Sequence, residues 1–457
     1  MQPLLPDSLP FDAAEAASIL KQLPAQQSAV FALVGEPGQE PYIGIAADLR
    51  RRLARLLLAD PAHPRRLQLA ARVRRIEWCL TGSRLEAQFL QFRLLEQAYG
   101  ERALERMHLR SPAFIRFHGS NAYPRLSVVT RLPRDHREWL YGPFASRAAA
   151  ERYCEEVLKL FLLRRCEENL HPDPSHPGCV YSEMKKCLAP CFQGCTDLRY
   201  AEEATAVEQF LATSGQSRLH VLTAERDAAS AALEFERAAV LHAAVRQVES
   251  VHALAGEIAR PLARLEACLV LPAAQPDAVA LFLFTRGLLR GPELFPTLGM
   301  RIQNEASGSS SLFAQPMLIE PVPEQPSAPA RTTARDALTA RLDAALEHLQ
   351  QTDVASIVRR NGDLALLSRW YHRPAQQRGG EIFFATQMEL DPHASSDGWM
   401  PCQWNRKAIL RGIGRVAAEQ LALRAQAKMD RVQTKEMQAQ ETQAQPGEDD
   451  PTHSVAW

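Results

Sequence analysis

The sequence predicts a multidomain protein of the α/β (α+β) class. Its 457 residues suffice for about two to four domains, and 46% hydrophobic and 23% charged residues are ordinary globular values. Residues 28–110 and 336–425 alternate short β-prone runs with helical segments, which indicates a small α/β unit in each. Between them, residues 166–195 hold five of the nine cysteines, and residues 198–253 are helical in pattern. We therefore expect two small α/β units separated by a cysteine-rich region and a helical hairpin.

The first unit can be predicted element by element. Turn residues separate two β-prone runs, and an aspartate then stands where a helix N-cap is needed. The expected elements are strand Ser28–Val34, a turn at 35–40, strand Tyr42–Ile45, a helix capped by Asp48, strand Val73–Leu80 and an amphipathic helix at 83–98. These make a small mixed sheet with helices that ends near residue 110.

Composition divides the rest of the chain. A Ser/Pro/Ala-rich stretch indicates a linker, and a Gln-, Glu- and Asp-rich end indicates disorder. The expected division is an extension at 1–27, the first unit at 28–110, the cysteine-rich region at 123–196, the helical hairpin at 198–253, a β-hairpin unit at 266–304, a linker at 305–335, the second α/β unit at 336–425 and a disordered tail at 426–457.

Charge is unevenly distributed, although the formal net charge is +0. Between residues 50 and 75 a single acid, Asp60, stands against a group of arginines. They are Arg50, Arg51, Arg52, Arg55, Arg65, Arg66, Arg72, Arg74 and Arg75. Basic faces of this kind bind nucleic-acid phosphates, and a solvated helix face is the alternative that composition leaves open.

The N-terminal sequence MQPLLPDSLPFDAAEAA has no basic region followed by an apolar run, so we expect no signal peptide. No segment approaches the roughly 20 apolar residues of a membrane span. We therefore expect a cytoplasmic protein. In that compartment nine cysteines indicate metal ligands or plain thiols rather than disulfides.

Four cysteines are candidate metal ligands: Cys166, Cys179, Cys187 and Cys191, with Cys195 four residues further on. Thiolates at this density among prolines suit a tetrahedral site, and both zinc and iron–sulfur clusters take four cysteinates. Spacing does not choose between the metals, and His171 or His176 could replace one thiolate. A loop of inert thiols is the other interpretation.

A family resemblance rests on segments spread over residues 28–296. Five of them occur in this order: AVFALVG, PYIGIAADLRRRL, YGPFASRAAAERYCEEVLKLFLLRRCEENL, CLAPC and ALEFERAAVLHAAVRQVESV. Together they resemble the UvrC/Cho family of excinucleases. The resemblance implies a GIY-YIG endonuclease domain that incises 3′ to damaged DNA, a 4Fe–4S cluster on the four cysteines, and a UVR motif that docks onto UvrB. Neither the RNase H-like nuclease nor the helix-hairpin-helix domain that ends full-length members is recognisable.

The resemblance also assigns the nuclease site, residue by residue. Tyr42 and Arg52 match a catalytic tyrosine and arginine, while the other four family positions hold replacements. These are Phe31 for a tyrosine, Ile45 for a lysine, Gln91 for the metal-binding glutamate and Ile115 for an asparagine. Glu86 and Glu96 each lie five residues from Gln91, about 140° round the helix, so neither is a ready substitute. We expect Mg²⁺ or Mn²⁺ only if the site is active, and DNA contacts from Arg50, Arg51 and Arg55.

The helical segment has the pattern of two amphipathic helices. Leu219, Leu222, Ala229 and Leu233 share one face, and Leu241, Ala244, Val248 and Val251 share the next. Two short helices bury little alone and invite a partner helix pair, so residues 219–251 are the candidate UvrB-docking motif. A plain internal hairpin is the alternative, and His242-Ala243 departs from the family's Arg-Asp.

Three functions therefore compete. One is a divergent endonuclease that still nicks damaged duplexes. Another is a catalytically silent relative that binds double-stranded DNA and UvrB. The third is a structural or redox-sensing module built on the cluster. Phe31, Ile45 and Gln91 favour the silent relative over the nuclease, and the cysteines do not separate the second function from the third.

Overall fold

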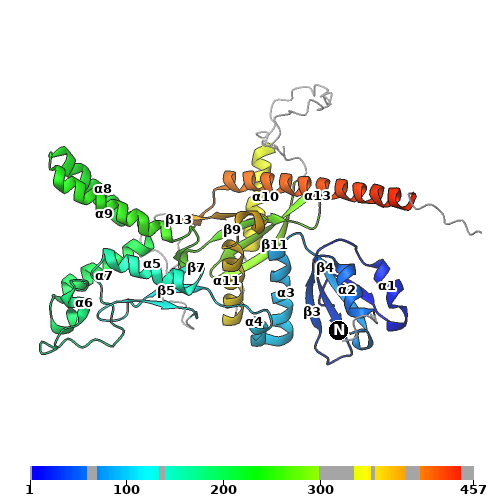
Figure 1. The fold of residues 1–457 in the computed structure, drawn as a ribbon, viewed down its shortest axis with the longest axis horizontal. Helices are drawn as coiled ribbons and strands as arrows, with labels where there is room; N and C mark the ends of the chain where they lie inside the picture. The colour runs from blue at the N-terminus through cyan, green and yellow to red at the C-terminus, as the bar shows by residue number, and fades with distance from the viewer. Residues whose placement is uncertain are drawn as a thin grey trace, which may run out of the picture.

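The computed structural model describes residues 3–58, 69–132, 139–297, 334–350, 356–387 and 402–443. Within them the chain forms three four-stranded antiparallel sheets and one two-stranded ribbon, with helices packed on each larger sheet (Figure 1). This confirms the expected multidomain α+β class. No helix in these residues is long and apolar enough to cross a membrane.

The N-terminal unit is a sheet in the order β1-β4-β2-β3, with β3 at an edge. Its strands are β1 (Asp7–Pro10), β2 (Ala29–Val34), β3 (Tyr42–Ala46) and β4 (Arg75–Leu80). Its helices are α1 (Ala16–Gln22), α2 (Leu49–Leu57), α3 (Arg84–Tyr99) and α4 (Ala103–Arg106). The elements expected between residues 28 and 98 are all present.

Local chemistry explains where these helices begin. The Asp48 carboxylate accepts from the Arg51 N–H at 3.1 Å, and the Ser83 hydroxyl accepts from the Glu86 N–H at 3.1 Å. Each bond satisfies an N–H that has no partner inside the helix. Both helices therefore start one residue after a side chain that caps them.

The first residues differ from the expected extension, because they belong to the N-terminal unit. Strand β1 pairs with β4, and Phe11, Leu20 and Leu23 are buried in the same core as β2. The buried Glu77 carboxylate accepts from the N–H groups of Leu4 and Leu5, at 2.6 and 3.1 Å. The N-terminal segment thus closes one edge of the sheet.

The middle unit is a sheet in the order β6-β5-β7-β8. Its strands are β5 (Ala113–Phe117), β6 (Leu126–Val129), β7 (Trp139–Phe144) and β8 (Arg260–Pro261). Its helices are α5 (Arg147–Leu160), α6 (Val180–Glu183), α7 (Asp197–Ala212), α8 (Gln216–Ala231) and α9 (Phe235–Leu254). Helices α8 and α9 form the expected hairpin, which projects from the body of the molecule (Figure 1).

The C-terminal unit is a sheet in the order β11-β10-β9-β12. Its strands are β9 (Ala267–Pro272), β10 (Ala278–Thr285), β11 (Leu288–Pro296) and β12 (Glu381–Phe384), with a ribbon of β13 (Thr386–Gln387) and β14 (Cys402–Gln403). Its helices are α10 (Ala334–Leu349), α11 (Ile357–Tyr371), α12 (Ala375–Arg378) and α13 (Arg406–Gln443). Short 3-10 turns elsewhere in the chain lie at Ala13–Glu15, Ala70–Arg72, Gly100–Arg102, Pro190–Phe192 and Leu262–Arg264.

Two parts of the expected C-terminal division differ from the structure. The units expected at 266–304 and 336–425 are one, because β12 pairs with β9 and so joins a single sheet. Residues 426–443, expected to be part of a disordered tail, continue α13 instead, since they are good helix formers without Gly or Pro. The expected linker at 305–335 and the last residues of the tail lie outside the described residues, apart from the start of α10.

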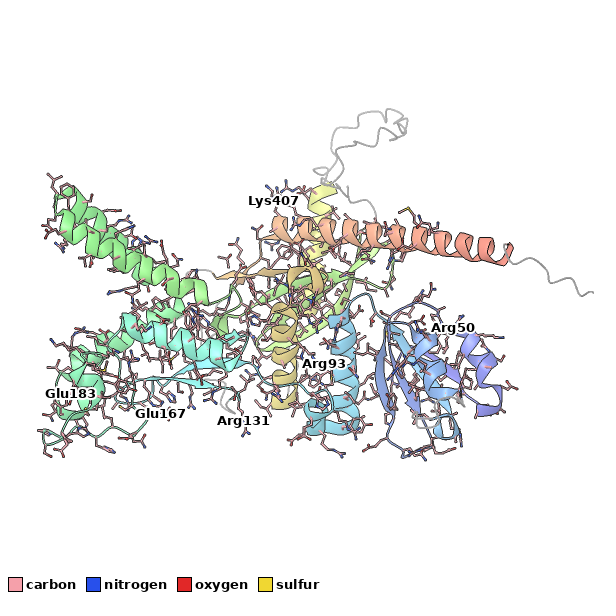
Figure 2. The ribbon with its side chains drawn as sticks, in the orientation of Figure 1. Arg50, Arg93, Arg131, Glu167, Glu183 and Lys407 are labelled. Atoms are coloured by element: carbon pink, nitrogen blue, oxygen red, sulfur yellow. The ribbon has the colours of Figure 1, made fainter. Side chains whose placement is uncertain are left out.

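Helix α3 belongs to two cores at once. One side packs on the N-terminal sheet, and the other packs on α11 and the C-terminal sheet, where the Phe89 and Phe282 rings meet edge to face at 5.4 Å. Gly362 of α11 allows this approach, because a Cβ there would lie 2.1 Å from Cζ of Phe92. Arg93 lies between the two helices (Figure 2). The C-terminal unit therefore holds the helix that carries Gln91.

Candidate nuclease-like pocket and cysteine cluster

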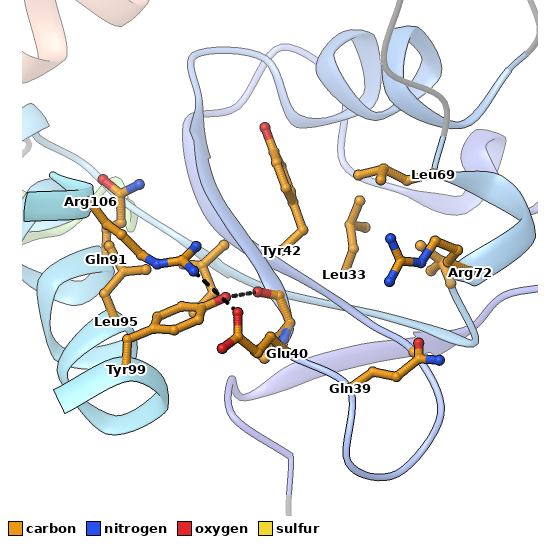
Figure 3. Close-up of a pocket in the computed structure, with 14 residues that line it drawn as sticks. Leu33, Gln39, Glu40, Tyr42, Leu69, Arg72, Gln91, Leu95, Tyr99 and Arg106 are labelled. Carbon is orange, nitrogen blue, oxygen red and sulfur yellow. Dashed lines mark hydrogen bonds and ion pairs between the residues drawn. The ribbon is translucent and has the colours of Figure 1, made fainter. Parts of the chain in front are cut away.

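A pocket of about 530 Å³ opens beside the edge strand β3 (Figure 3). It is lined by Leu33, Gly35, Gln39, Glu40, Pro41, Tyr42, Ile43, Leu69, Arg72, Val73, Gln91, Leu95, Tyr99 and Arg106. Two of the residues assigned from the sequence, Tyr42 on β3 and Gln91 on α3, are among them. The pocket thus brings together two of the positions that the family resemblance assigns.

Phe31 lies behind Tyr42 rather than in the pocket. Its ring is fully buried, with its centroid 6.1 Å from that of Tyr42. Phe31 pairs with Gly44 across the two strands, and a Cβ on Gly44 would lie 2.7 Å from Cζ of Phe31. The glycine of Tyr-Ile-Gly therefore makes room for the aromatic ring of the neighbouring strand.

The remaining assigned positions lie away from the pocket lining. Arg52 is on α2, where its Nε is buried without a hydrogen-bond partner. Ile45 packs in the small core between β2, β3 and α3. Ile115 is on β5 and is fully buried in the middle unit's core, so the structure does not bring it together with Tyr42 and Gln91.

Charged residues that no sequence motif singles out complete the pocket. Glu40 is the one acid in the described lining, and its carboxylate pairs with Arg106 at 3.1 Å and Arg102 at 3.5 Å. The Arg106 guanidinium lies 3.7 Å from the centre of the Tyr99 ring, and the Tyr99 hydroxyl donates to the Pro41 carbonyl at 2.7 Å. Glu40 ends the turn 35–40, where an exposed acid is ordinary, so the sequence gives no reason to select it.

The two glutamates near Gln91 in sequence are both engaged elsewhere. Glu86 is buried and accepts from the Gly82 N–H at 2.8 Å, and burial raises its pKa to about 6. Glu96 accepts from Arg359 at 2.9 Å and from the Ser356 hydroxyl at 3.0 Å. Neither lines the pocket, as the helical spacing predicts.

The basic face expected on α2 is only partly available to a ligand. Arg50, on the outer side of the N-terminal unit (Figure 2), donates from Nε to the Leu23 carbonyl at 2.9 Å. Arg74 and Arg75 pair with Glu36 and Glu77, at 2.8 and 2.6 Å. Arg51 and Arg55 are exposed. Arg65 and Arg66 lie outside the described residues.

Cys166, Cys179, Cys187 and Cys191 lie near one another in the middle unit. Burial raises the pKa of the Cys187 thiol to about 11, and the other three cysteines add to the increase. The pKa of Cys191 is raised by burial and by Cys179 and Cys166. Cys195 is electrostatically coupled only to Cys191 among them.

The donor chemistry of this group fits a four-thiolate site. The Ala189 N–H donates to Sγ of Cys187 at 3.3 Å, and Nη1 of Arg164 donates to Sγ of Cys166 at 3.6 Å. Such bonds stabilise thiolate charge. Across the described residues, however, no three His, Cys, Asp or Glu side chains converge closely enough to hold an ion. The Nδ1 atom of His176 accepts from the Gly178 N–H at 3.0 Å, which is a turn contact.

The α8–α9 hairpin buries its inner faces and exposes its tip. Leu222, Ala229, Val248 and Val251 are buried, as the pattern predicts, but Leu233, expected on the same face as Leu222, lies beyond the end of α8. At the tip, Leu233 and Phe235 are 70% and 67% exposed, and Val240 on the following turn is 70% exposed. The hairpin therefore ends in an apolar surface without a cover in the described residues.

Comparison with known proteins links the middle unit to one family. A family model described as the UvrC/Cho excinuclease middle domain matches residues 113–210, from β5 to α7, including the four cysteines. The UvrABC system protein C of Ruegeria sp. (strain TM1040) is 28% identical over 228 residues, which are 50% of this chain and 35% of that protein. The protein of the same name from Alcanivorax borkumensis is 26% identical over 227 residues, 50% of this chain and 37% of that protein.

A third relative, the UvrABC system protein C of Hyphomonas neptunium, is 28% identical over 232 residues, 51% of this chain and 37% of that protein. The matched region therefore spans little more than a third of the length of these relatives. No solved structure matches the chain. The resemblance expected from the sequence is nevertheless confirmed: the chain is similar to UvrC-like proteins over half its length, and residues 113–210 match the family's middle domain.

Proposed function

We propose that this protein binds double-stranded DNA in nucleotide excision repair and that its N-terminal unit is a GIY-YIG-like nuclease domain with impaired incision chemistry. The observation that carries this proposal is the pocket beside β3. It retains Tyr42, but Gln91 stands where the family has its metal-binding glutamate. A glutamine offers a carbonyl oxygen without negative charge, and Mg²⁺ prefers carboxylates.

Incision of DNA needs several catalytic groups to act together, so replacing more than one of them has a large effect on activity. A nuclease of this kind requires a base for water, an anionic ligand for the metal and cations that stabilise charge on the phosphate. Here Phe31 lacks a hydroxyl and is buried, and Ile45 lacks a charge. Catalytic groups of this kind act together, so the loss of several of them is expected to lower the incision rate by orders of magnitude.

An active nuclease is the second candidate, and Glu40 favours it. This carboxylate lines the pocket with Tyr42 and could bind a metal in place of the lost glutamate. Its pairing with Arg102 and Arg106 opposes that role, because two cations already neutralise it. We therefore favour a pocket without nuclease activity.

The four cysteines are proposed to hold a 4Fe–4S cluster, with zinc as the alternative metal. Cys166, Cys179, Cys187 and Cys191 would be the ligands, and the Ala189 N–H and Arg164 would donate to their sulfurs. When bound, such a cluster supplies electron transfer or a structural cross-link of the loop. The redox-sensing function rests on this site alone.

UvrB is the proposed protein partner, and the tip of the α8–α9 hairpin is the proposed contact. Leu233, Phe235 and Val240 are large apolar side chains that are mostly exposed, and apolar helix faces of this kind bind partner helices. The hairpin's base packs on α5, which leaves the tip free to reach another protein.

The proposed function is tested by measuring DNA binding and nicking on the same protein. Purified protein should bind an undamaged duplex with a strong salt dependence, and should leave a supercoiled plasmid intact with Mg²⁺ or Mn²⁺. Loss of the supercoiled form that Glu40→Gln prevents would establish the nuclease instead. Failure to bind any duplex at low salt would refute the DNA-binding function.

A further inference from the structure

Helices α3 and α11 run side by side in opposite directions, and their ion pairs are gathered at one end. There Arg93 pairs with Asp363 at 2.8 Å, and Arg359 pairs with Glu96 at 2.9 Å. Asp363 is fully buried and also accepts from the Leu289 N–H at 2.9 Å. At this end, Arg93 and Arg359 each form an ion pair with a carboxylate.

The other end of the same helix pair gathers arginines instead. Arg84 begins α3, Arg369 lies in the last turn of α11, and Arg373 follows two residues after the end of that helix. Arg369 donates to the His108 carbonyl at 2.8 Å, and Ser111 contacts Asn361 at 2.8 Å, so the segment with the exposed Arg110 runs along α11. We call Arg84, Arg369 and Arg373 the junction arginines.

At the end of the helix pair where α3 begins, positively charged side chains lie close to one another. The pKa of Arg373 is lowered, first by partial burial and then by the nearby charges of Arg84 and Arg369. Glu86, two residues from Arg84, is buried and accepts from the Gly82 N–H at the helix start. In the part of the chain that the structure describes, none of the junction arginines forms an ion pair with a carboxylate.

This grouping stands out against the rest of the molecule. The chain has equal numbers of acidic and basic residues, and several exposed arginines elsewhere are paired with an acid, as Arg147 is with Glu151 and Arg199 with Glu203. Holding several cations together without an acid costs free energy unless an anion joins them. The fold keeps that arrangement where three segments of the chain meet.

We propose that the junction arginines bind the backbone phosphates of double-stranded DNA. A duplex presents about one negative charge per 1.7 Å of its axis, so the phosphates of one DNA duplex can neutralise several arginines at once. This inference rests on the proposed DNA-binding function and assigns it to a second surface, separate from Arg51 and Arg55 on α2. Because the arginines come from residues 84, 369 and 373, no local charge run in the sequence reveals the site.

The test is the salt dependence of duplex binding by Arg84→Gln/Arg369→Gln/Arg373→Gln. Each lost phosphate contact should reduce the slope of log K against log salt by about 0.9, so the triple variant should lose about 2 to 3 units of slope. The matched control is Arg147→Gln/Arg199→Gln/Arg237→Gln, which removes the same charge from exposed, acid-paired positions. The control should keep the native slope.

A second variant guards against misfolding. Arg84→Lys/Arg369→Lys/Arg373→Lys keeps the charges but loses the guanidinium forks, and it should keep most of the slope. If native protein binds the duplex and the glutamine triple variant keeps its full slope, the junction site is wrong and the DNA-binding function stands. An equal loss of slope in the control would also refute the site, because only total charge would then count. Native protein that binds no duplex would refute both.

Discussion

Gly44 shows how one missing side chain shapes the N-terminal sheet. The Phe31 ring covers Gly44 from the neighbouring strand, and there is no space for a Cβ between them. Because β3 is an edge strand, the ring also holds that edge against the sheet. The Tyr-Ile-Gly triplet is therefore explained by packing as well as by catalytic resemblance.

Gly44→Ala should destabilise the N-terminal unit by about 1–3 kcal/mol, the usual cost of an overpacked core. The measurement is chemical denaturation together with hydrogen–deuterium exchange in β2 and β3. Gly414→Ala is the control, since a Cβ at this helical position meets nothing within 4 Å. It should leave stability unchanged or raise it by up to about 1 kcal/mol. Equal effects of the two changes would contradict the packing explanation.

Glu86 gives the stability of the N-terminal unit a pH dependence. Burial raises its pKa in the folded protein from 4.5 to about 6, so the folded state binds the proton more tightly than the unfolded state. A raised folded pKa adds stability that is present below the unfolded pKa and is lost as pH rises through the folded pKa. From well below pH 4.5 to well above pH 6 this carboxyl should therefore remove about 2 kcal/mol of stability in total.

Glu86→Gln keeps an oxygen that can accept from the Gly82 N–H but removes the titration. The free energy of unfolding of this variant should depend less on pH between 4.5 and 6 than that of the native protein. Urea denaturation at several pH values measures the difference. Parallel pH profiles would mean that Glu86 titrates normally in the folded state.

At the scale of elements, the cysteine loop offers an internal control. Cys187→Ser or Cys191→Ser should abolish the brown colour of anaerobically purified protein and the roughly four irons per chain that a Cys-ligated 4Fe–4S cluster supplies. Cys195→Ser should retain both, because the proposed ligands are Cys166, Cys179, Cys187 and Cys191. Metal analysis distinguishes the alternatives. A colourless native protein with one zinc would refute the cluster, and loss of metal in Cys195→Ser would change the ligand set.

The α8–α9 hairpin is the second element for which we propose a function of its own. Leu233→Ala/Phe235→Ala should weaken binding to purified UvrB by about tenfold or more without changing the hairpin's stability, because both side chains are mostly exposed. Leu198→Ala on α7, where the side chain is 72% exposed, is the matched control. Calorimetric titration measures both. Unchanged affinity of the double variant would indicate that the hairpin is internal structure only.

At the scale of the whole molecule, the sequence predicts those features of the fold that depend on residues close together in the chain. Asp48 and Ser83 fix two helix starts, and a short apolar, β-prone run bounded by turn residues fixes strand β2. The hairpin's buried faces follow from periodicity in the same way. The resemblance adds Tyr42 and Gln91 as a pair, and the structure brings these two into one pocket.

Contacts between distant segments are what the sequence does not reveal. Strand β12 joins β9 across more than a hundred residues, and α11 packs on α3 across more than two hundred and fifty. Neither pairing leaves a local signal, so one C-terminal unit appears as two in the sequence. Glu40 and the junction arginines are hidden for the same reason. Ile115 is the converse case, since a motif position lies in another core.

The central claim is that the nuclease pocket keeps its fold while its chemistry has been lost. The most direct measurement is metal-dependent nicking of a supercoiled plasmid by the native protein and by Phe31→Tyr/Ile45→Lys/Gln91→Glu. Ile115 is left native, because it is buried in the middle unit. The native protein should not nick, and no single replacement should suffice, since a metal without its base leaves the barrier high.

The triple variant should nick with Mg²⁺ or Mn²⁺, and Tyr42→Phe in that background should stop it. A native protein that nicks, and loses the activity on Tyr42→Phe, would contradict the claim and would make Glu40 or Gln91 the metal ligand.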